Sequence, residues 1–173
     1  NGLGQTVTVT TTTDANGVYT FTNVPAGTYT LVETNKSGYT STGDVDGGAV
    51  DSIALTVTSG TNVSGRDFWD TLPVTIGGGV YNDLNGNGVQ NAGEPGMAGV
   101  TVTRTGGVTT TTDANGLYTF TVLAGTYSVT ETNPAGFTST GAEAGTTGST
   151  VINTDRVDVT LTSGQTALQS DFL

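Results

Sequence analysis

The sequence of 173 residues contains no cysteine and no histidine. Without thiol and imidazole side chains the chain cannot form a disulfide framework, a Cys- or His-ligated zinc site, a haem ligand set or a Cys/His catalytic pair. Most familiar enzyme mechanisms depend on one of these groups. The composition therefore favours a protein that is not an enzyme.

Positive charge is also scarce, with 4 Lys and Arg against 15 Asp and Glu and a formal net charge of -11. Proteins that bind nucleic acid or anionic membranes need cationic side chains to displace counterions from phosphates, so we expect no nucleic-acid partner. No run approaches 18 apolar residues, and no basic-then-apolar leader opens the sequence, so we expect no membrane insertion and a mature or excised segment. Cations are the expected partners.

Two residue types are abundant instead. The chain has 39 threonines and 27 glycines, with 34% hydrophobic residues. Threonine favours strands, whereas glycine interrupts them and supplies turns. We therefore expect an all-β fold.

An internal repeat organises the chain. Residues 11–21 read TTTDANGVYTF and residues 110–120 read TTTDANGLYTF, and the similarity continues through AGTYTLVETN (26–35) and AGTYSVTETN (124–133). Each copy closes on Asp-Phe, at 67–68 and 171–172. Such a repeat predicts two modules of one fold, which we place at residues 1–70 and 71–173.

The two copies differ at their starts. The second has a long lead-in from Val74 to Thr105, whereas only residues 1–10 precede the matching turn of the first. We therefore expect the first module to lack its N-terminal strands, which leaves an open edge and core. Three explanations stay open: a fragment of a longer array, strands donated by another chain, or a naturally short module.

Within each copy the residue pattern predicts strands. Tyr19 and Phe21 alternate with threonines over residues 18–22, as in a half-buried strand, and Asn16-Gly17 and Asn115-Gly116 suit tight turns. Asp14 and Asp113 are expected to accept backbone N–H groups in Asx turns. Glu33 and Glu131 share strand parity with core residues, and a buried carboxylate needs a partner.

One segment has the spacing of a calcium loop. Residues 83–94 read DLNGNGVQNAGE and fit the twelve-position EF-hand pattern D-x-[DN]-x-[DN]-G-x5-E without a mismatch. Calcium takes six to eight hard oxygen ligands, and Gly88 occupies the sharp turn between them. The predicted ligands are the side chains of Asp83, Asn85, Asn87, Asn91 and Glu94 and the carbonyl of Val89.

The expected ion is structural. Only two of the ligand side chains are anionic, which suits millimolar extracellular calcium, and the strand-like flanks exclude the helix movement of a signalling EF-hand. Other carboxylates are weaker candidates for further metal sites or are simply solvated acidic loops: Asp44, Asp46, Asp51, Asp155 and Asp158.

Residues 80–102, VYNDLNGNGVQNAGEPGMAGVTV, followed by TTTDANGLYTF, AGTYSVTETNPAGF and a closing DF, resemble the SdrD B-type repeat of bacterial surface proteins. That repeat is similar to Cna B-type and prealbumin-like domains. The resemblance covers nearly all of the second module and the first apart from its lead-in. It implies two tandem prealbumin-like β-sandwiches in a stalk or filament at the cell surface, stiffened by calcium.

The resemblance also implies a core glutamate, matched by Glu33 and Glu131, that promotes a Lys-Asn isopeptide bond in many Cna B-type domains. The sequence departs from that pattern, because Lys36 is its only lysine and the second module has none. A Lys-Asn crosslink inside the second module is chemically impossible.

We therefore expect a non-enzymatic extracellular structural protein: a calcium-stiffened tandem repeat of a stalk, filament or surface layer that associates with itself, with strand donation to the first module as one means. The alternative is a surface adhesin that binds a protein or glycan through its variable acidic loops. An enzyme is the least favoured, because nothing in the sequence places two carboxylates across a cleft.

Overall fold

The computed structural model describes residues 7–145 and 148–173, and every regular element in them is a β-strand. The all-β prediction is confirmed. The described part of the chain therefore contains no helix long and apolar enough to cross a membrane. Two units emerge: residues 1–34 with 43–68, and residues 35–42 with 69–173.

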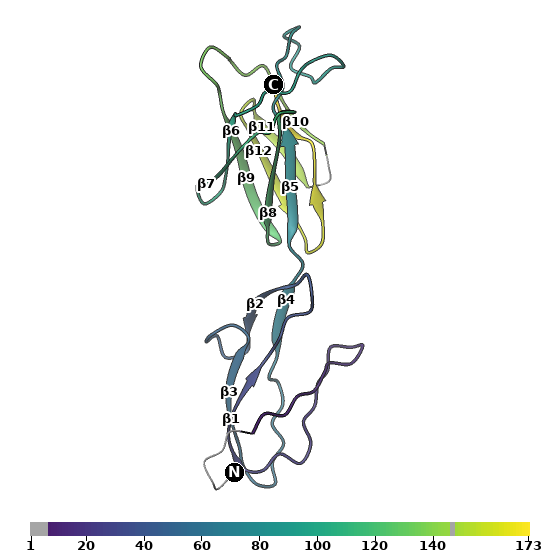
Figure 1. The fold of residues 1–173 in the computed structure, drawn as a ribbon, viewed down its shortest axis with the longest axis vertical. Coiled ribbons are helices and arrows are strands. Elements are labelled where there is room, and N and C mark those ends of the chain that lie inside the picture. The colour runs from purple at the N-terminus through teal and green to yellow at the C-terminus, as the bar shows by residue number, and fades with distance from the viewer. Residues whose placement is uncertain (1–6, 146–147) are drawn as a thin grey trace. The chain divides into compact units, whose positions relative to one another are not determined.

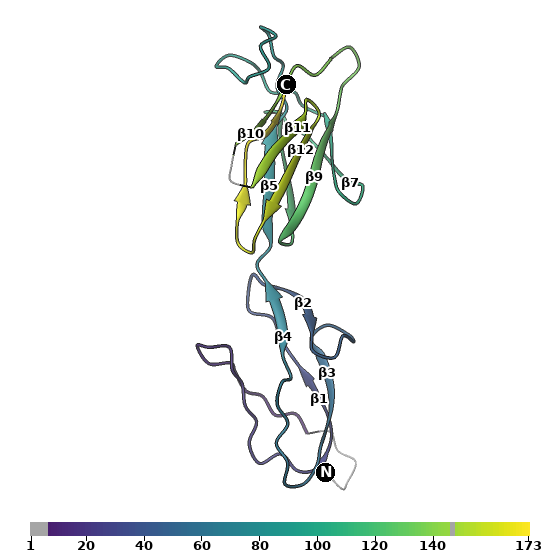
Figure 2. The same cartoon turned by 180° about the vertical axis from the view of Figure 1, so that it is seen from behind.

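The second unit is built on a five-stranded antiparallel sheet in the order β11-β12-β9-β6-β7. Figure 2 shows β11, β12 and β9 of this sheet side by side. Its strands are β6 (Thr101–Arg104), β7 (Val108–Thr111), β9 (Gly125–Thr132), β11 (Ser149–Asn153) and β12 (Arg156–Leu161). The central pair, β9 and β12, keeps its register over six residues, from Thr130 opposite Arg156 to Gly125 opposite Leu161.

A second layer faces this sheet (Figure 1). It consists of a three-stranded sheet, β13-β5-β8, and a two-stranded sheet, β10-β14. The strands are β5 (Val74–Gly79), β8 (Leu117–Val122), β10 (Ala142–Ala144), β13 (Thr166–Ala167) and β14 (Ser170–Phe172). A parallel bridge between Val80 and Phe172 joins the two small sheets, so the unit is a β-sandwich.

The core of the second unit lies between these layers. Buried and exposed residues alternate along β8, where Tyr118, Phe120 and Val122 point inward between outward-facing residues, and Ile76 of β5 is fully buried opposite Phe120. The other layer contributes Val102, Val129, Val157 and Val159, all 0% exposed. Period-2 alternation therefore produces a closed apolar core, as expected for a sandwich.

The first unit contains β1 (Gly27–Val32) and β3 (Ser52–Val57), an antiparallel pair in which Tyr29 lies opposite Leu55. β2 (Thr40–Asp44) pairs with β4 (Phe68–Thr71). Along β1 the inward residues are only half-buried, and Ile53 is the one buried hydrophobic residue of the described part of this unit.

The structure differs from the sequence prediction at residues 18–22, which form no strand. Tyr19 and Phe21 are half-buried between exposed neighbours, so the predicted alternation is present. A strand also needs hydrogen-bonding partners. In the second unit the matching residues of β8 obtain theirs from β5.

Candidate metal centre

The loop of residues 83–94 begins where β5 has ended, and its two ends are held together. Asn82 donates its N–H to the carbonyl of Pro95 (2.9 Å), Met97 donates to Val80 (2.8 Å), and Tyr81 bridges to Gly96. Asp83 and Glu94 therefore stand at the two ends of a closed loop, as the first and twelfth positions of a calcium loop must.

Asp83 organises the first half of the loop. Its Oδ1 accepts N–H groups of Gly86 (2.7 Å) and Asn87 (3.3 Å), and its Oδ2 accepts the N–H of Gly88 (2.8 Å) and the hydroxyl of Thr140 (2.7 Å). These hydrogen bonds, that from Gly88 foremost and that from Thr140 next, lower the pKa of Asp83 to about 2. The carboxylate is ionised under all ordinary conditions.

The three predicted asparagine ligands converge on one point. Nδ2 of Asn85 and Nδ2 of Asn87 each donate to Oδ1 of Asn91 over 2.8 Å. Each of these two side chains also closes an Asx turn. Oδ1 of Asn85 accepts the N–H of Asn87 (3.0 Å), and Oδ1 of Asn87 accepts the N–H of Val89 (2.9 Å). The three side chains therefore gather at one place, with the amide nitrogens of Asn85 and Asn87 turned toward the oxygen of Asn91.

Glu94 closes the loop from a buried position. It is 9% exposed, and its Oε2 accepts the N–H of Asn91 over 2.8 Å. Its Oε1 is buried and receives no hydrogen bond from any described residue. A buried carboxylate oxygen without a partner is costly, and a cation is one way to satisfy it.

The loop packs against residues 140–141, far along the chain. A Cβ on Gly88 would lie 2.8 Å from the carbonyl oxygen of Thr140, and one on Gly141 would lie 2.3 Å from that of Gly88. Gly88 also has φ of 72°, a conformation that favours glycine. The contact with Thr140 spans 57 residues, so no local sequence signal predicts it.

The structure brings together five of the six predicted ligand residues: Asp83, Asn85, Asn87, Asn91 and Glu94. Val89 is exposed and joins the network through its N–H, while the ligand role of its carbonyl stays a prediction. The carboxylate and amide oxygens are the hard donors that calcium prefers, and the orphaned Glu94 oxygen fits a cation. The donor set suits calcium.

The weaker candidates fall into separate places. Asp44 is 5% exposed, and its Oδ1 accepts the N–H of Gly47. Asp46 accepts N–H groups of Gly48 and Ala54, and the hydrogen bond from Gly48, with Asp44 next, lowers its pKa. Both aspartates therefore shape the turn that leads into β3.

Asp155 and Asp158 have different surroundings although they are close in sequence. Asp158 forms a salt bridge with Arg156 (2.8 Å), which lowers the pKa of this aspartate. The side chain of Asp155 instead hydrogen-bonds Ser139, and its carbonyl accepts the N–H of Glu131. Asp51 makes the corresponding backbone bond to Glu33 in the first unit, with φ of 67°.

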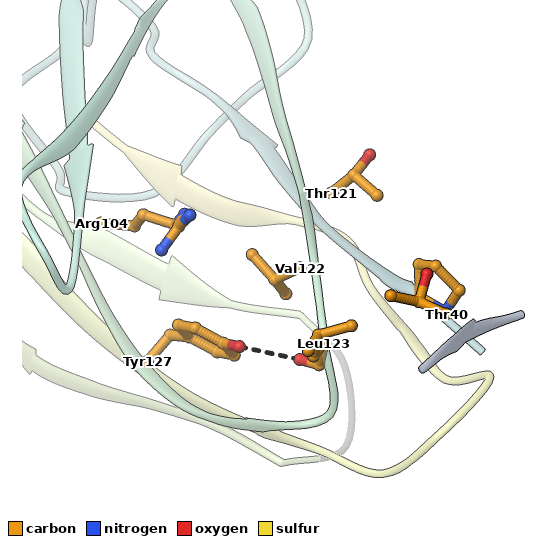
Figure 3. A pocket seen from close by; sticks show the side chains of 7 residues that line it. Thr40, Arg104, Thr121, Val122, Leu123 and Tyr127 are labelled. Atoms are coloured by element: carbon orange, nitrogen blue, oxygen red, sulfur yellow. Dashed lines mark hydrogen bonds between the residues drawn. The ribbon is translucent and has the colours of Figure 1, made fainter. Parts of the chain in front are cut away.

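A shallow hollow elsewhere in the second unit is lined by Arg104, Thr121, Val122, Leu123 and Tyr127 (Figure 3). The hydroxyl of Tyr127 donates to the carbonyl of Leu123 (2.9 Å), and the guanidinium of Arg104 lies 5.8 Å from the Tyr127 ring centroid. These contacts are cation–π and structural, and this set of side chains contains no acid–base pair suited to catalysis.

The family profile described as SdrD B-like domain matches residues 2–66 and again residues 74–172. The chain therefore belongs to the SdrD B-like domain family. It is 37% identical over 150 residues to serine-aspartate repeat-containing protein D of Staphylococcus aureus (strain Newman), which covers 79% of this chain and 11% of that protein. It is 39% identical over 165 residues to serine-aspartate repeat-containing protein C of S. aureus (strain N315), covering 88% and 17%.

The chain thus spans less than a fifth of the length of these relatives. Among solved structures, the Bacillus anthracis TIE protein matches 87% of this chain and 34% of its own, at 12% identity and a TM-score of 0.37, too low to inform the fold.

Proposed function

We propose that this chain is a non-enzymatic structural segment of an extracellular bacterial surface protein, stiffened by calcium in the loop of residues 83–94. Membership of a repeat-domain family, with serine-aspartate repeat-containing proteins as relatives, supports the structural role. The loop's two anionic side chains, Asp83 and Glu94, give an affinity suited to millimolar extracellular calcium.

The buried, unpartnered Oε1 of Glu94 carries the calcium part of this proposal. Natural proteins rarely leave a buried carboxylate oxygen unsatisfied, and here it lies at the position from which an EF-hand glutamate closes the ligand sphere. The side chains of Asn85 and Asn87 lie beside Oδ1 of Asn91, each at 2.8 Å, so the three amide side chains are gathered in the same loop as Glu94.

Hydrogen bonds within the chain would extend the rigidity of the calcium loop to residues outside it. Calcium, when bound, supplies positive charge that offsets the repulsion between Asp83 and Glu94. Asp83 holds the Thr140 hydroxyl, Thr140 donates its N–H to the carbonyl of Leu173 (2.7 Å), and Leu173 donates to Gly141 (3.0 Å). A fixed loop would therefore also restrain Leu173, the residue that follows β14.

Calorimetry with calcium and with a chelator tests the loop. A ligand that binds only the folded state at a hundred times its dissociation constant stabilises it by about 2.7 kcal/mol, so we expect a clear rise in Tm. Glu94→Gln should remove most of that rise, whereas Glu143→Gln, a half-buried carboxylate beside the loop, should keep it. Equal Tm values for the wild type in both buffers would contradict the proposal.

We further propose that a neighbouring copy of the protein donates a strand to residues 18–23, as the basis of self-association. In the second unit β5 fills this place, pairing Ile76 with Phe120 and Val74 with Val122 of β8. In the first unit the matching residues are in no strand, and Val18 is 58% exposed. An unpaired edge of this kind is a template for another chain.

A peptide of residues 73–80 tests this part. It should slow hydrogen exchange at Tyr19–Thr22 and reduce any concentration-dependent association seen by light scattering, whereas a scrambled peptide should do neither. A wild type that stays monomeric at high concentration, and does not respond to the peptide, would rule out strand donation.

A further inference from the structure

The outer edge of β8 is unpaired. This strand stands at one end of the three-stranded sheet β13-β5-β8, so no described strand pairs with its other side. The N–H of Val80 donates to Gly116 (2.9 Å), and hydrogen-bonded pairs alternate along an antiparallel ladder. The backbone groups of Thr119 and Thr121 therefore face away from β5 and are available to another strand.

β8 has none of the features that commonly protect a free edge. Residues 117–122 read LYTFTV, with no proline, no lysine and no other charge, and their pairing with β5 runs without a bulge. Leu117 at the start of β8 is 46% exposed, and Leu123 directly after its end is 39% exposed. The edge is therefore suited to β-strand addition, in which an extended peptide pairs with free backbone groups.

The shallow hollow beside this edge contains one positive charge. Figure 3 shows Arg104 and Tyr127 on one side of the hollow and Thr121, Val122 and Leu123 on the other. Among the described residues that line the hollow, Arg104 alone is charged. A strand added to β8 would direct alternate side chains to the face on which Val122 lies, and so towards this hollow.

Arg104 has no acidic partner, although the chain has 15 acidic residues. Its Nη1 donates to the carbonyl of Thr105 (3.0 Å), and its Nε is buried without an acceptor among the described residues. The guanidinium lies 6.0 Å from the ring centroid of Phe120 and 5.8 Å from that of Tyr127. Residues 101–130 contain one acidic residue, Asp113, whose Oδ1 accepts N–H groups of its own turn. A carboxylate that enters the hollow therefore meets a cation that no described carboxylate neutralises.

We propose that the outer edge of β8 and Arg104 together bind an extended peptide that carries an acidic side chain. The peptide pairs as a strand with Thr119 and Thr121, and its carboxylate pairs with the guanidinium of Arg104. Backbone pairing supplies affinity, whereas the charge pair selects an acidic residue. The site uses neither the loop of residues 83–94 nor residues 18–23, so it goes beyond the function proposed above and is tested independently of it.

NMR titration of the isotope-labelled full chain with the capped pentapeptide Val-Thr-Glu-Thr-Val tests the site. In an extended strand its glutamate points to the hollow, and the backbone groups of its two threonines face β8. The peptide should shift the amide signals of Thr119 and Thr121 and slow their hydrogen exchange. Replacing its glutamate by glutamine should weaken binding by at least about tenfold, because the charge pair is lost. Replacing its threonines by proline, which has no N–H, should abolish binding.

Variants of the protein test the two halves of the site separately. Arg104→Gln should bind the glutamate peptide at least about tenfold more weakly than the wild type does. The matched control Arg156→Gln, which removes an arginine already paired with Asp158 (2.8 Å), should bind it like the wild type. Thr121→Pro removes an N–H that faces away from β5, so it should keep the fold and lose binding.

Equal binding of the glutamate and glutamine peptides to the wild type would overturn the proposal, and so would unshifted amides at Thr119 and Thr121. This comparison needs no variant, so it holds even if Arg104→Gln fails to fold. Shifts of the same two amides with protein concentration, in the absence of peptide, would identify a second copy as the occupant and also overturn the proposal.

Discussion

Residues 11–21 and residues 110–120 are identical at ten of eleven positions, yet only the second copy leads into a strand. Their turns are the same. Asp14 accepts N–H groups of Asn16 (2.8 Å) and Val18 (2.9 Å), and Asp113 accepts those of Asn115 (2.8 Å) and Leu117 (2.9 Å). Gly17 and Gly116 have φ of 78° and 80°. Eleven residues are enough to specify this turn.

The aromatic packing is also shared. Tyr19 and Phe21 have ring centroids 6.1 Å apart, and those of Tyr118 and Phe120 are 6.0 Å apart. Each tyrosine packs at 6.4 Å against the phenylalanine of the closing Asp-Phe pair, Phe68 or Phe172. The aromatic contacts are thus present in both copies, although residues 18–22 pair with no strand of the described part of the chain.

The two copies therefore separate three levels of structure. The turn depends on local hydrogen bonds, the aromatic contact depends on the closing strand, and the strand itself depends on β5. A β-strand is completed by its neighbour, so identical sequences take different secondary structure when only one has that neighbour.

Hydrogen exchange should show the largest difference between the copies. The alternate amides of β8 that bond to β5 should exchange at least about a thousandfold more slowly than the amides of Tyr19–Thr22, because they open only with the sandwich. NMR on monomeric protein, confirmed by light scattering, gives the comparison. Similar protection in both copies would mean that residues 18–22 have a strand partner.

The next largest difference between the units is expected in the unfolding free energy that each loses when a core residue is truncated. Ile76→Ala empties space in a closed core and should lower the free energy of unfolding of the second unit by about 2–5 kcal/mol. Ile53→Ala in the first unit should cost less, because the residues around Ile53 are half-exposed and can relax or admit water. Urea unfolding followed at resolved NMR signals of each unit measures both. Equal losses would show that the first core is closed in solution.

In the metal-free protein, the stability of the second unit should depend on pH through the protonation of Glu131. Its pKa is raised from 4.5 to about 7 in the folded state, so the folded state binds more protons than the unfolded state between these values. Stability should therefore fall by about 3 kcal/mol as pH rises from 4.5 to 7 in chelator, and level off above that.

Thermal unfolding between pH 4.5 and 7 measures how stability changes with pH. Glu131→Gln should abolish most of this change, since the amide does not titrate, whereas Asp158→Asn should retain it. A wild-type slope of the opposite sign, with stability rising towards pH 7, would show that Glu131 is charged and satisfied in the folded protein.

The sequence predicts the parts of the molecule that depend on local pattern. The all-β fold, the Asx turns at Asp14 and Asp113, and the buried position of Glu131 all follow from alternation and turn residues. Asp83, the three asparagines and Glu94 lie in one closed loop, because twelve residues with a glycine at the bend close on themselves, while their role as calcium ligands stays a prediction.

Long-range pairing is what the sequence does not predict. The hydrogen bond from Thr140 to Asp83, and the meeting of Glu131 with Asp155 and Ser139, join residues far apart in the chain. The missing strand at residues 18–22 has the same origin, because its residues alternate as predicted but no strand among the described residues pairs with them. The alternation of residues along a strand indicates which of its faces is buried. The topology of the fold determines which strand pairs with it.

The smallest expected effect concerns the turn that both copies share. Asp113→Ala removes two hydrogen bonds and should lower the free energy of unfolding of the second unit by about 1 kcal/mol, because β8 starts from this turn. Asp14→Ala should leave the unfolding of the first unit almost unchanged and only speed exchange at the Val18 amide, since no strand follows it. Urea unfolding and amide exchange measure the two variants. If Asp14→Ala lowers the free energy of unfolding as much as Asp113→Ala does, then the turn stabilises the first unit without a following strand. The claim that the stabilisation by this turn depends on the following strand would then be wrong.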